Sequence, residues 1–271
     1  MTPSGIELEY RGHCAVITLN RPEKRNAFNR EMWAALDSVA RRLHDRLPRA
    51  VVITGAGGSA FCAGFDVNPE NPQVSELMGA VQKRDRAPAE ELVRYIRGVV
   101  DHLVSLPVPL IAAINGLAYG GGAELASRCD MRVMDPAAVV CFSEVRLGLM
   151  PDWGGGVALS RLIGRSHAAD LILTARRVGA EEAFRIGLTD RVSAPGRALE
   201  ESLALAESIA KNGPRAVRSA LEVIRRAADI QLRDALEFET MIAADLIASG
   251  ECVHGITAFL KKTEPEFPDP E

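Results

Sequence analysis

The chain has 271 residues, of which 47% are hydrophobic and 25% are charged, and its formal net charge is −4. This length and balance predict a globular chain with one large core and an appendage, and they exclude a disordered or fibrous protein. Nucleic acid is not an expected partner, because neutralising phosphates requires a concentrated basic face. The composition also limits which cellular compartment and which cofactors we expect.

Five cysteines without CxxC spacing or a metal-like cluster favour a reduced, cytoplasmic setting with most thiols buried, and no metal site is expected. The N-terminal residues lack a cationic stretch followed by an apolar one, and no apolar window approaches the length of a membrane span. We therefore predict a cytoplasmic protein that does not bind membranes.

Strands and helices alternate along the first two thirds of the chain. Strands are predicted over 6–10 and 14–19, and an amphipathic helix follows with apolar residues at helical spacing from Met32 to Leu47. A buried strand at 50–54, a helix around 90–105 and a strand at 110–114 come next. This alternation predicts an α/β layer arrangement.

The character of the sequence changes at about residue 198. Gly213 and Pro214 begin one helix, because proline is tolerated in a first helical turn, and residues 231–262 are typical of further helices. We therefore divide the chain into a core over 1–197 and a helical region over 198–271.

Two segments between these elements allow more than one interpretation. The stretch TGAGGSAFCAGFD at 54–66 has the glycine spacing of a dinucleotide fingerprint, but no helix is predicted directly after the glycines, so we take it as a chance match. The proline-containing segment 67–91 is either a mobile lid over a ligand or a long surface connection.

The stretch LAYGGGAELA at 117–126 places glycines where a strand passes into a helix. The amides of Gly121 and Gly122 are then at the helix N-terminus, where they have no acceptor in the helix and favour negative charge on a ligand. The segment around Gly64 and Phe65 also follows a strand and could offer a second free amide. Two converging amides would form an oxyanion hole, whereas the alternative is that the glycines only permit close packing.

Six ordered stretches across nearly the whole chain resemble the crotonase superfamily, the enoyl-CoA hydratase/isomerase family. They are LNRPEKRNAFN (19–29), VITGAGGSAFCAGFD (52–66), PLIAAINGLAYGGGAELASRCDMRV (109–133), FSEVRLGLMPDWGGG (142–156), LTARRVGAEEAFRIGLTDRV (173–192) and ITAFLKK (256–262). The resemblance implies an α/β fold with a ββα superhelix core and a C-terminal helical trimerisation region. It further implies a homotrimer or a dimer of trimers, with 231–262 at the interface.

The same resemblance assigns roles to individual residues. It implies that the backbone amides of Phe65 and Gly121 form the oxyanion hole for the thioester carbonyl of an acyl-CoA. Glu124 is assigned chiefly to a water molecule and Glu144 to the proton delivered at Cα, although the two carboxyl groups can share both tasks. Without the resemblance, each glutamate would be interpreted as a solvated surface charge.

Asp152 decides between two reactions. Several hydratases have glycine at its position, whereas dienoyl-CoA and some other enoyl isomerases have an acid there, so a third carboxylate could move a proton along an acyl chain. Because isomerases of this kind often lack the first glutamate and Glu124 is present, hydratase is the leading prediction and isomerase the alternative. Asp152 could also be a helix N-cap or turn residue. Dehalogenases with an acid here carry tryptophan in place of Glu144, which disfavours that reaction.

Further substrate contacts are carried over from the family. The implied CoA-binding or substrate-binding residues are Arg21, Lys24, Arg25, Ala63, Asp66, Gly120, Trp153 and Lys262. Lys262, like Lys261, is expected to reach the CoA of a neighbouring subunit, although lysines in a last helical turn also suit the helix dipole. Neither a metal nor a redox cofactor is expected. A non-catalytic acyl-CoA-binding subunit is the third alternative, which the retention of both glutamates disfavours.

Overall fold

The computed structural model describes residues 5–270, and its frame is a six-stranded sheet with the order β1-β2-β3-β5-β7-β10. The strands are β1 (Ile6–Arg11), β2 (Cys14–Leu19), β3 (Ala50–Gly55), β5 (Leu110–Ile114), β7 (Met131–Met134) and β10 (Arg191–Val192). The β1 and β2 strands are antiparallel, and the others pair in parallel. The strands predicted from the sequence are therefore confirmed to within one residue.

A second, smaller sheet has the order β4-β6-β8-β9. Its strands are β4 (Ala60–Cys62), β6 (Leu117–Tyr119), β8 (Val139–Cys141) and β9 (Val178–Gly179), of which β4, β6 and β8 run in parallel. Each of these three follows a strand of the large sheet along the chain, and helical turns follow each of them. This repeated strand–strand–helix unit confirms the predicted α/β fold with a ββα superhelix core.

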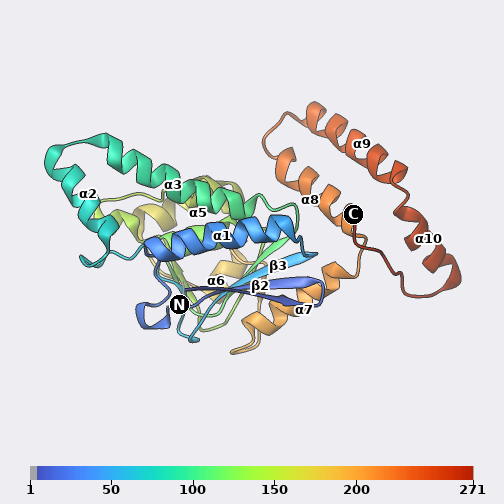
Figure 1. Ribbon diagram of the computed structural model, residues 1–271, viewed down its shortest axis with the longest axis horizontal. Coiled ribbons are helices and arrows are strands. Elements are labelled where there is room, and N and C mark those ends of the chain that lie inside the picture. The colour runs from blue at the N-terminus through green and yellow to red at the C-terminus, as the bar shows by residue number, and fades with distance from the viewer. Residues whose placement is uncertain (1–4, 271) are drawn as a thin grey trace.

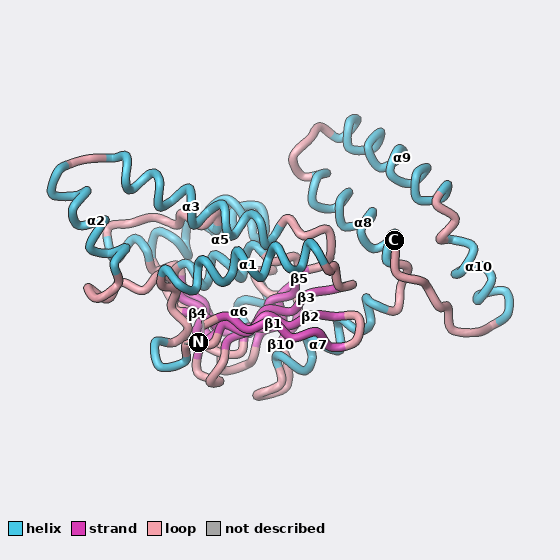
Figure 2. The backbone as a smooth tube through the Cα atoms, in the orientation of Figure 1, coloured by secondary structure: helices cyan, strands magenta, loops and turns pink. Residues whose placement is uncertain are grey.

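Helices cover both faces of the large sheet, because alternate residues of each strand point to opposite faces. On one face, α1 (Arg30–Asp45) and α3 (Arg86–Val104) pack on residues such as Val51 and Ile53 (Figures 1 and 2). On the other face, α7 (Ala198–Ala210) packs on Ala50 and Val52. The α7 helix thus lies on the sheet, although the sequence groups it with the C-terminal region.

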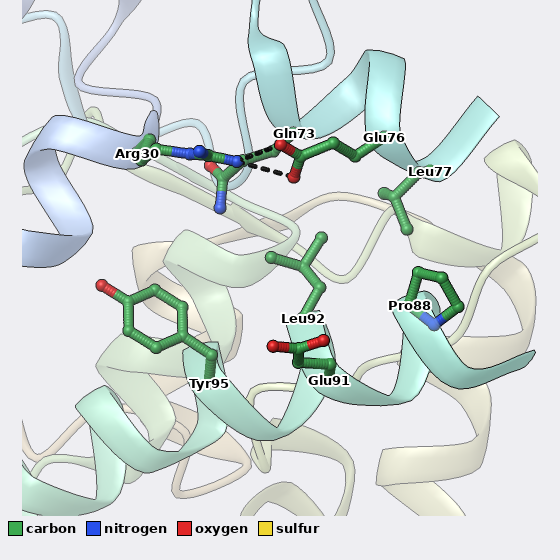
Figure 3. A pocket seen from close by; sticks show the side chains of 8 residues that line it. All are labelled: Arg30, Gln73, Glu76, Leu77, Pro88, Glu91, Leu92 and Tyr95. Carbon is green, nitrogen blue, oxygen red and sulfur yellow. Dashed lines mark hydrogen bonds and ion pairs between the residues drawn. The ribbon is translucent and has the colours of Figure 1, made fainter. Parts of the chain in front are cut away.

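The segment 67–91 is largely helical, and its role as a lid over a ligand stays a prediction. It contains α2 (Pro72–Lys83) and the first turns of α3, which begins at Arg86 rather than near residue 90. The α2 helix buries only Gln73 and Ala80, and an ion pair joins its Glu76 to Arg30 of α1 (Figure 3). In contrast, the glycines of 54–66 lead into β4 and not into a helix, so the dinucleotide match is a chance one.

The remaining helices are short or lie towards the C-terminus. They are η1 (Pro22–Lys24), α4 (Gly121–Arg128), η2 (Glu144–Leu147), α5 (Gly155–Thr174), α6 (Ala180–Arg185), α8 (Pro214–Ala227), α9 (Leu232–Ala248) and α10 (Cys252–Lys261). The α8, α9 and α10 helices project away from the sheets (Figure 1), and α9 buries none of its residues. The tail then returns to the core, where Arg49 donates to the Phe267 carbonyl at 2.6 Å and pairs with Asp269 at 2.7 Å.

Four of the five cysteines, all except Cys252, are buried as free thiols, as predicted. Among residues 5–270, no helix combines the length and the apolar character that crossing a membrane requires.

Candidate active site

The candidate site lies at the carboxyl ends of the three parallel strands of the small sheet. The β4, β6 and β8 strands are neighbours, so their carboxyl ends meet at one edge. Phe65, Gly121 and Glu144 each lie two or three residues beyond the end of one of these strands. Segments about twenty to fifty-five residues apart in sequence therefore meet at the position where open α/β sheets commonly bind ligands.

A cavity of about 230 Å³ lies at this edge. Eight of the residues predicted to form the site line it: Ala63, Phe65, Gly120, Gly121, Glu124, Glu144, Asp152 and Trp153. The rest of its wall is mainly apolar and comes from Val67, Leu77, Ala89, Leu92, Val93, Ile96, Leu147, Leu149 and Met150, together with Ser143. From the sequence, only the segment 67–91 and Met150 were expected to bear on the acyl chain, because the rest of the wall depends on the tertiary packing of α3 and η2.

Two backbone amides in the cavity wall are free to bind a ligand. Within residues 5–270, neither the Phe65 N–H nor the Gly121 N–H has an acceptor in the chain, whereas the Gly120 N–H donates to the Cys141 carbonyl at 2.9 Å. The two loops touch, because a Cβ added at Gly64 would lie 2.9 Å from the Gly121 nitrogen. Gly64 also has φ +87°, which favours glycine. Adjacent free amides of this kind suit an oxygen that gains negative charge.

Gly121 is glycine for a packing reason as well. A Cβ at this position would collide with the indole ring of Trp153. That indole is 3% exposed and packs edge-on against Phe28 and Trp33, with ring centroids 5.7 and 4.6 Å away. The tight-packing interpretation and the free-amide interpretation of the glycine run are therefore compatible, because the same residue meets both requirements.

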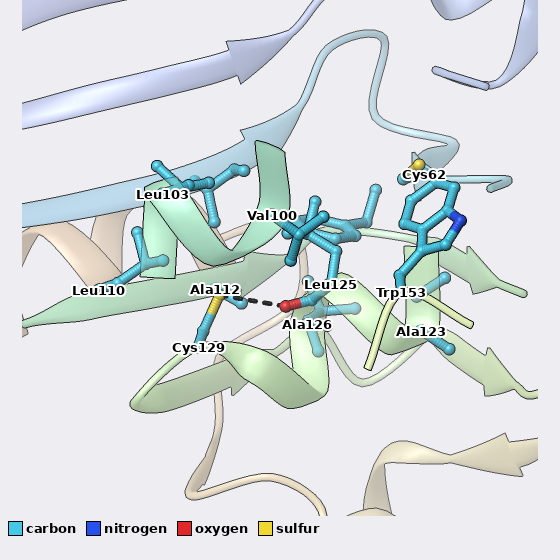
Figure 4. Packing of buried hydrophobic residues seen from close by; sticks show 14 of the residues in the cluster. Cys62, Val100, Leu103, Leu110, Ala112, Ala123, Leu125, Ala126, Cys129 and Trp153 are labelled. Atoms are coloured by element: carbon cyan, nitrogen blue, oxygen red, sulfur yellow. Dashed lines mark hydrogen bonds between the residues drawn. The ribbon is translucent and has the colours of Figure 1, made fainter. Parts of the chain in front are cut away.

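Glu124 is held rigidly in the middle of the site. Its helix, α4, is buried among residues such as Val100 and Leu103 of α3 (Figure 4), and Glu124 itself is 1% exposed. Its carboxylate accepts hydrogen bonds from the amides of Asp152 at 3.2 Å, Trp153 at 2.8 Å and Gly155 at 2.8 Å. These donors include the first amide of α5, so the side chain also serves as the anionic group at that helix N-terminus.

Glu144 has a different environment. It is also buried, at 9% exposed, but neither carboxylate oxygen has a hydrogen-bond partner among the described residues. Burial raises its pKa, and burial together with the charge of Glu144 raises the pKa of Glu124 to about 8, against the effect of the Gly155 and Asp152 amides. Two buried carboxyl groups that interact in this way favour holding a proton between them.

Asp152 lines the same cavity but is exposed to solvent. The neighbouring protein atoms remove enough water to raise its pKa. It does not cap α5, because the N-cap of that helix is Gly154 and no side chain donates or accepts there. The N-cap interpretation of Asp152 is therefore wrong, and the structure places Asp152 among the residues that line the cavity.

The residues predicted to contact CoA from outside the cavity either bind each other or are exposed. Arg21 pairs with Asp66 at 2.6 Å and donates to the Ala27 carbonyl at 3.1 Å, and Asp66 also accepts from the Asn68 amide. Lys24 and Arg25 are exposed at η1, and the exposed Lys262 ends α10. Their contacts with CoA stay predictions.

Two supporting residues were missed by the sequence analysis. Arg128 donates to the Trp153 carbonyl at 2.9 Å and pairs with Asp101, which fixes the turn before α5. Gly155 must lack a side chain, because a Cβ there would collide with Glu124. The second triple-glycine run, at 154–156, was the available signal for this close approach. Within the part of the chain that the structure describes, no three His, Cys, Asp or Glu side chains group as metal ligands would.

Comparison with known proteins identifies the family of the chain. The profile of the enoyl-CoA hydratase/isomerase family matches residues 9–270. A short-chain-enoyl-CoA hydratase of Clostridium acetobutylicum is 33% identical over 98% of each chain, and an enoyl-CoA isomerase/hydratase of Zymoseptoria tritici is 35% identical over 97% of this chain and 86% of the relative. The crystal structure of an enoyl-CoA hydratase from Bacillus anthracis superposes with a TM-score of 0.87 at 33% identity, covering 97% of this chain and 98% of that one.

The chain belongs to the enoyl-CoA hydratase/isomerase family, whose fold it has over nearly its whole length. Acyl-CoA thioesters are the substrate class that this family implies.

Proposed function

We propose that this protein is an enoyl-CoA hydratase, which adds water across the 2,3 double bond of an enoyl-CoA thioester. The observation that carries the proposal is the position of Glu124 and Glu144 in one cavity with the free amides of Phe65 and Gly121. Hydration requires these two kinds of group together: carboxyl groups that move protons and donors that stabilise the enolate oxygen.

The reaction follows from the environment of each residue. The thioester oxygen accepts from the Phe65 and Gly121 amides, and a water molecule held by Glu124 attacks Cβ and passes its proton to the Glu124 carboxylate, so that the pair of glutamates holds one proton before and after the reaction. The electron pair of the double bond then forms an enolate, and Cα takes a proton from Glu144. Glu144 suits proton delivery because its oxygens have no partner in the described chain, so it can take up the proton that the buried pair retains and pass it to Cα.

Isomerisation is the second candidate, and Asp152 is the observation that favours it. Its carboxylate lines the same cavity and has a raised pKa, so with Glu144 it could move a proton between two carbons of an acyl chain. A non-catalytic acyl-CoA-binding subunit is less well supported, because such a subunit has no need of two buried glutamates whose pKa values are both raised by burial.

The proposal extends to the binding of CoA and to assembly. Lys24 and Arg25 at η1 are exposed cations of the same subunit that could bind its phosphates, and Lys262 could do so from a neighbouring subunit. We infer a homotrimer or a dimer of trimers in which α9 and α10 form contacts, because these helices expose large apolar side chains. They include Leu232, Leu236, Met241, Ile247, Ile256, Phe259 and Leu260.

Product analysis in water labelled with oxygen-18 tests this function. The protein is incubated separately with 2-enoyl-, 3-enoyl- and 3,5-dienoyl-CoA, and the molecular masses of the products are measured by mass spectrometry. Hydration predicts that the 2-enoyl thioester gains one labelled water. Migration of the double bond without a gain of mass would assign isomerisation instead, and thioesters that bind unchanged would favour the binding subunit.

A further inference from the structure

The α4 helix binds the turn that precedes α5 through two side chains. Glu124 and Arg128 lie four residues apart on α4, so they share one face of the helix. The Glu124 carboxylate accepts from three amides of the turn, whereas Nη1 of Arg128 donates to the Trp153 carbonyl at 2.9 Å. The turn is therefore bound both through its N–H groups and through a carbonyl.

The turn presents its amides to Glu124 in a conformation that depends on Gly154. The amides of Trp153 and Gly155 both donate to Oε2 of Glu124, each at 2.8 Å. Gly154 lies between them with φ +94°, in the region that favours glycine. A side chain at Gly154 would also collide with the Arg128 guanidinium. The guanidinium thus lies against the residue whose backbone conformation brings these two amides to one oxygen.

Arg128 is held in place by the neighbouring helix. Its Nη2 donates to Asp101 of α3 at 2.7 Å, and Asp101 also accepts from Arg97. The Arg128 side chain is 15% exposed, and it is not one of the described residues that line the cavity with the two glutamates. A substrate in that cavity would meet Glu124 but not Arg128, so the influence of Arg128 on the reaction is indirect.

The groups that face Glu124 show what the turn contributes. Burial and the charges of Glu144 and Asp152 raise the pKa of Glu124 to about 8. The amides of Gly155 and Asp152 act in the opposite direction, because they stabilise the ionised carboxylate. Within residues 5–270, Arg128 forms its ion pair with Asp101 and none with Glu124. Its effect on Glu124 therefore passes through the amides of the turn.

We propose that Arg128 is a positioning residue, which holds the Trp153 carbonyl and so keeps the turn 152–155 in the conformation that directs three amides at Glu124. The same contact fixes Asp152 in the cavity wall, because Asp152 belongs to this turn. The inference rests on the proposed function only where it concerns the rate of hydration, since the hydrogen bonds of Glu124 do not depend on which reaction the site performs.

Titration of Glu124 tests the inference without requiring turnover. The protein is labelled with carbon-13 at the glutamate side-chain carboxyl groups, and the signal of Glu124 is assigned by its loss in Glu124→Gln. In Arg128→Met we expect the midpoint of this titration to move up by about one pH unit, because the amides that favour the ionised form are no longer held in place. An unchanged titration in folded Arg128→Met would overturn the inference.

Two further variants distinguish this effect from a general disturbance of the fold. Arg94→Met removes an exposed ion pair with Glu90 on α3 and should leave the Glu124 titration as in the native protein. If Arg128→Met does not fold, Asp101→Asn takes its place, since it removes the anionic partner of Arg128 and should move the midpoint in the same direction by less. Midpoints that move equally in Arg94→Met and Asp101→Asn would contradict the assignment.

Kinetics with a 2-enoyl-CoA separate positioning from substrate binding. Because Arg128 does not line the cavity, Arg128→Met should lower kcat by up to about 10²-fold while KM stays within about threefold of the native value. The pH at which kcat/KM is largest should also move up, in step with the titration of Glu124. A change confined to KM would contradict a positioning role.

The outcomes also separate this inference from the proposed function. A Glu124 titration that responds to Arg128→Met, together with no hydration of any enoyl-CoA by the native protein, would keep the positioning role and reject the reaction. Hydration by a protein whose Glu124 titration does not respond to Arg128→Met would do the reverse.

Discussion

The two glutamates of the site differ in their hydrogen bonds. Glu124 accepts three backbone amides and is fixed in direction, whereas Glu144 has two unpartnered oxygens in the described chain. A fixed carboxylate is suited to orienting water, and an unpartnered one is suited to exchanging a proton. This contrast supports the division of labour that the family resemblance implies.

How much of the site could be predicted from the sequence depends on how far apart in the chain the contacting residues lie. Both glutamates, Phe65 and Gly121 occur in motifs that resemble the family, and that resemblance implied one site for them. The three amides on Glu124 belong to residues 28 to 31 positions further along, and no local pattern indicates that contact. Asp152 is the opposite case, because its local sequence allowed a helix cap as one alternative, whereas the N-cap of α5 is Gly154.

Gly121→Ala tests the packing of the oxyanion loop. The new Cβ would collide with Trp153, so the first turn of α4 must move and carry the Gly121 amide with it. We expect kcat to fall about 10²- to 10³-fold, as for the loss of an oxyanion donor, and stability to fall by about 1–3 kcal/mol. Enzyme assays and thermal unfolding measure both effects. Gly98→Ala is the control, because a Cβ there meets nothing within 4 Å; equal activity in the two variants would refute this prediction.

The paired glutamates also predict how stability depends on pH. Burial and the charge of Glu144 raise the pKa of Glu124 from 4.5 to about 8, so the folded chain keeps a proton that the unfolded chain releases. Stability should therefore decrease as pH rises from about 4.5 to about 8, by up to about 1.4 kcal/mol per pH unit for one linked proton.

Urea unfolding at pH 6 and pH 8 measures this dependence. In Glu144→Gln the decrease should be smaller, since the substitution removes one titrating group and the charge that raises the pKa of the other. Glu222→Gln, at an exposed position of α8, is the control. A decrease that is unchanged in Glu144→Gln would show that these carboxyl groups do not share a proton.

At the scale of elements, the sequence was least informative about α2. The prolines of 67–91 left both a lid and a surface connection open, but Pro72 and Pro88 lie in the first turns of α2 and α3, where proline costs no hydrogen bond. Asn71 and Asp85 cap these helices with their side chains, which is a signal that could have been used. The strands of the small sheet were missed because two to three residues show no periodicity.

The α9 and α10 helices carry the prediction about assembly. Large apolar side chains exposed on both helices are unfavourable in water and indicate a protein partner, which we expect to be further copies of this chain. Analytical ultracentrifugation should show a trimer or hexamer, and a Leu236→Glu, Phe259→Glu double variant should shift it towards monomer. Val81→Glu, on the exposed α2, is the control; a monomeric native protein would refute the assignment.

Across the whole molecule, one repeated unit accounts for both the fold and the site. Each strand of the small sheet follows a strand of the large one, and its carboxyl end supplies one part of the cavity: Phe65, then Gly121 with Glu124, then Glu144. The apolar strands of the large sheet predicted the α/β layers, whereas the repeated unit was implied only by the resemblance to the family. The position of the C-terminal helices relative to the core could not be predicted, because they make few contacts with it.

The relative importance of Glu144 and Asp152 is the central point of the proposed function. The most direct test is the kcat for hydration of a 2-enoyl-CoA by Glu144→Gln and by Asp152→Asn, measured side by side on folded proteins. We predict that Glu144→Gln loses about 10²- to 10⁴-fold, as expected for a general acid, while Asp152→Asn stays within about tenfold of the native protein. Loss of activity in Asp152→Asn with activity retained in Glu144→Gln would contradict the glutamate-pair mechanism.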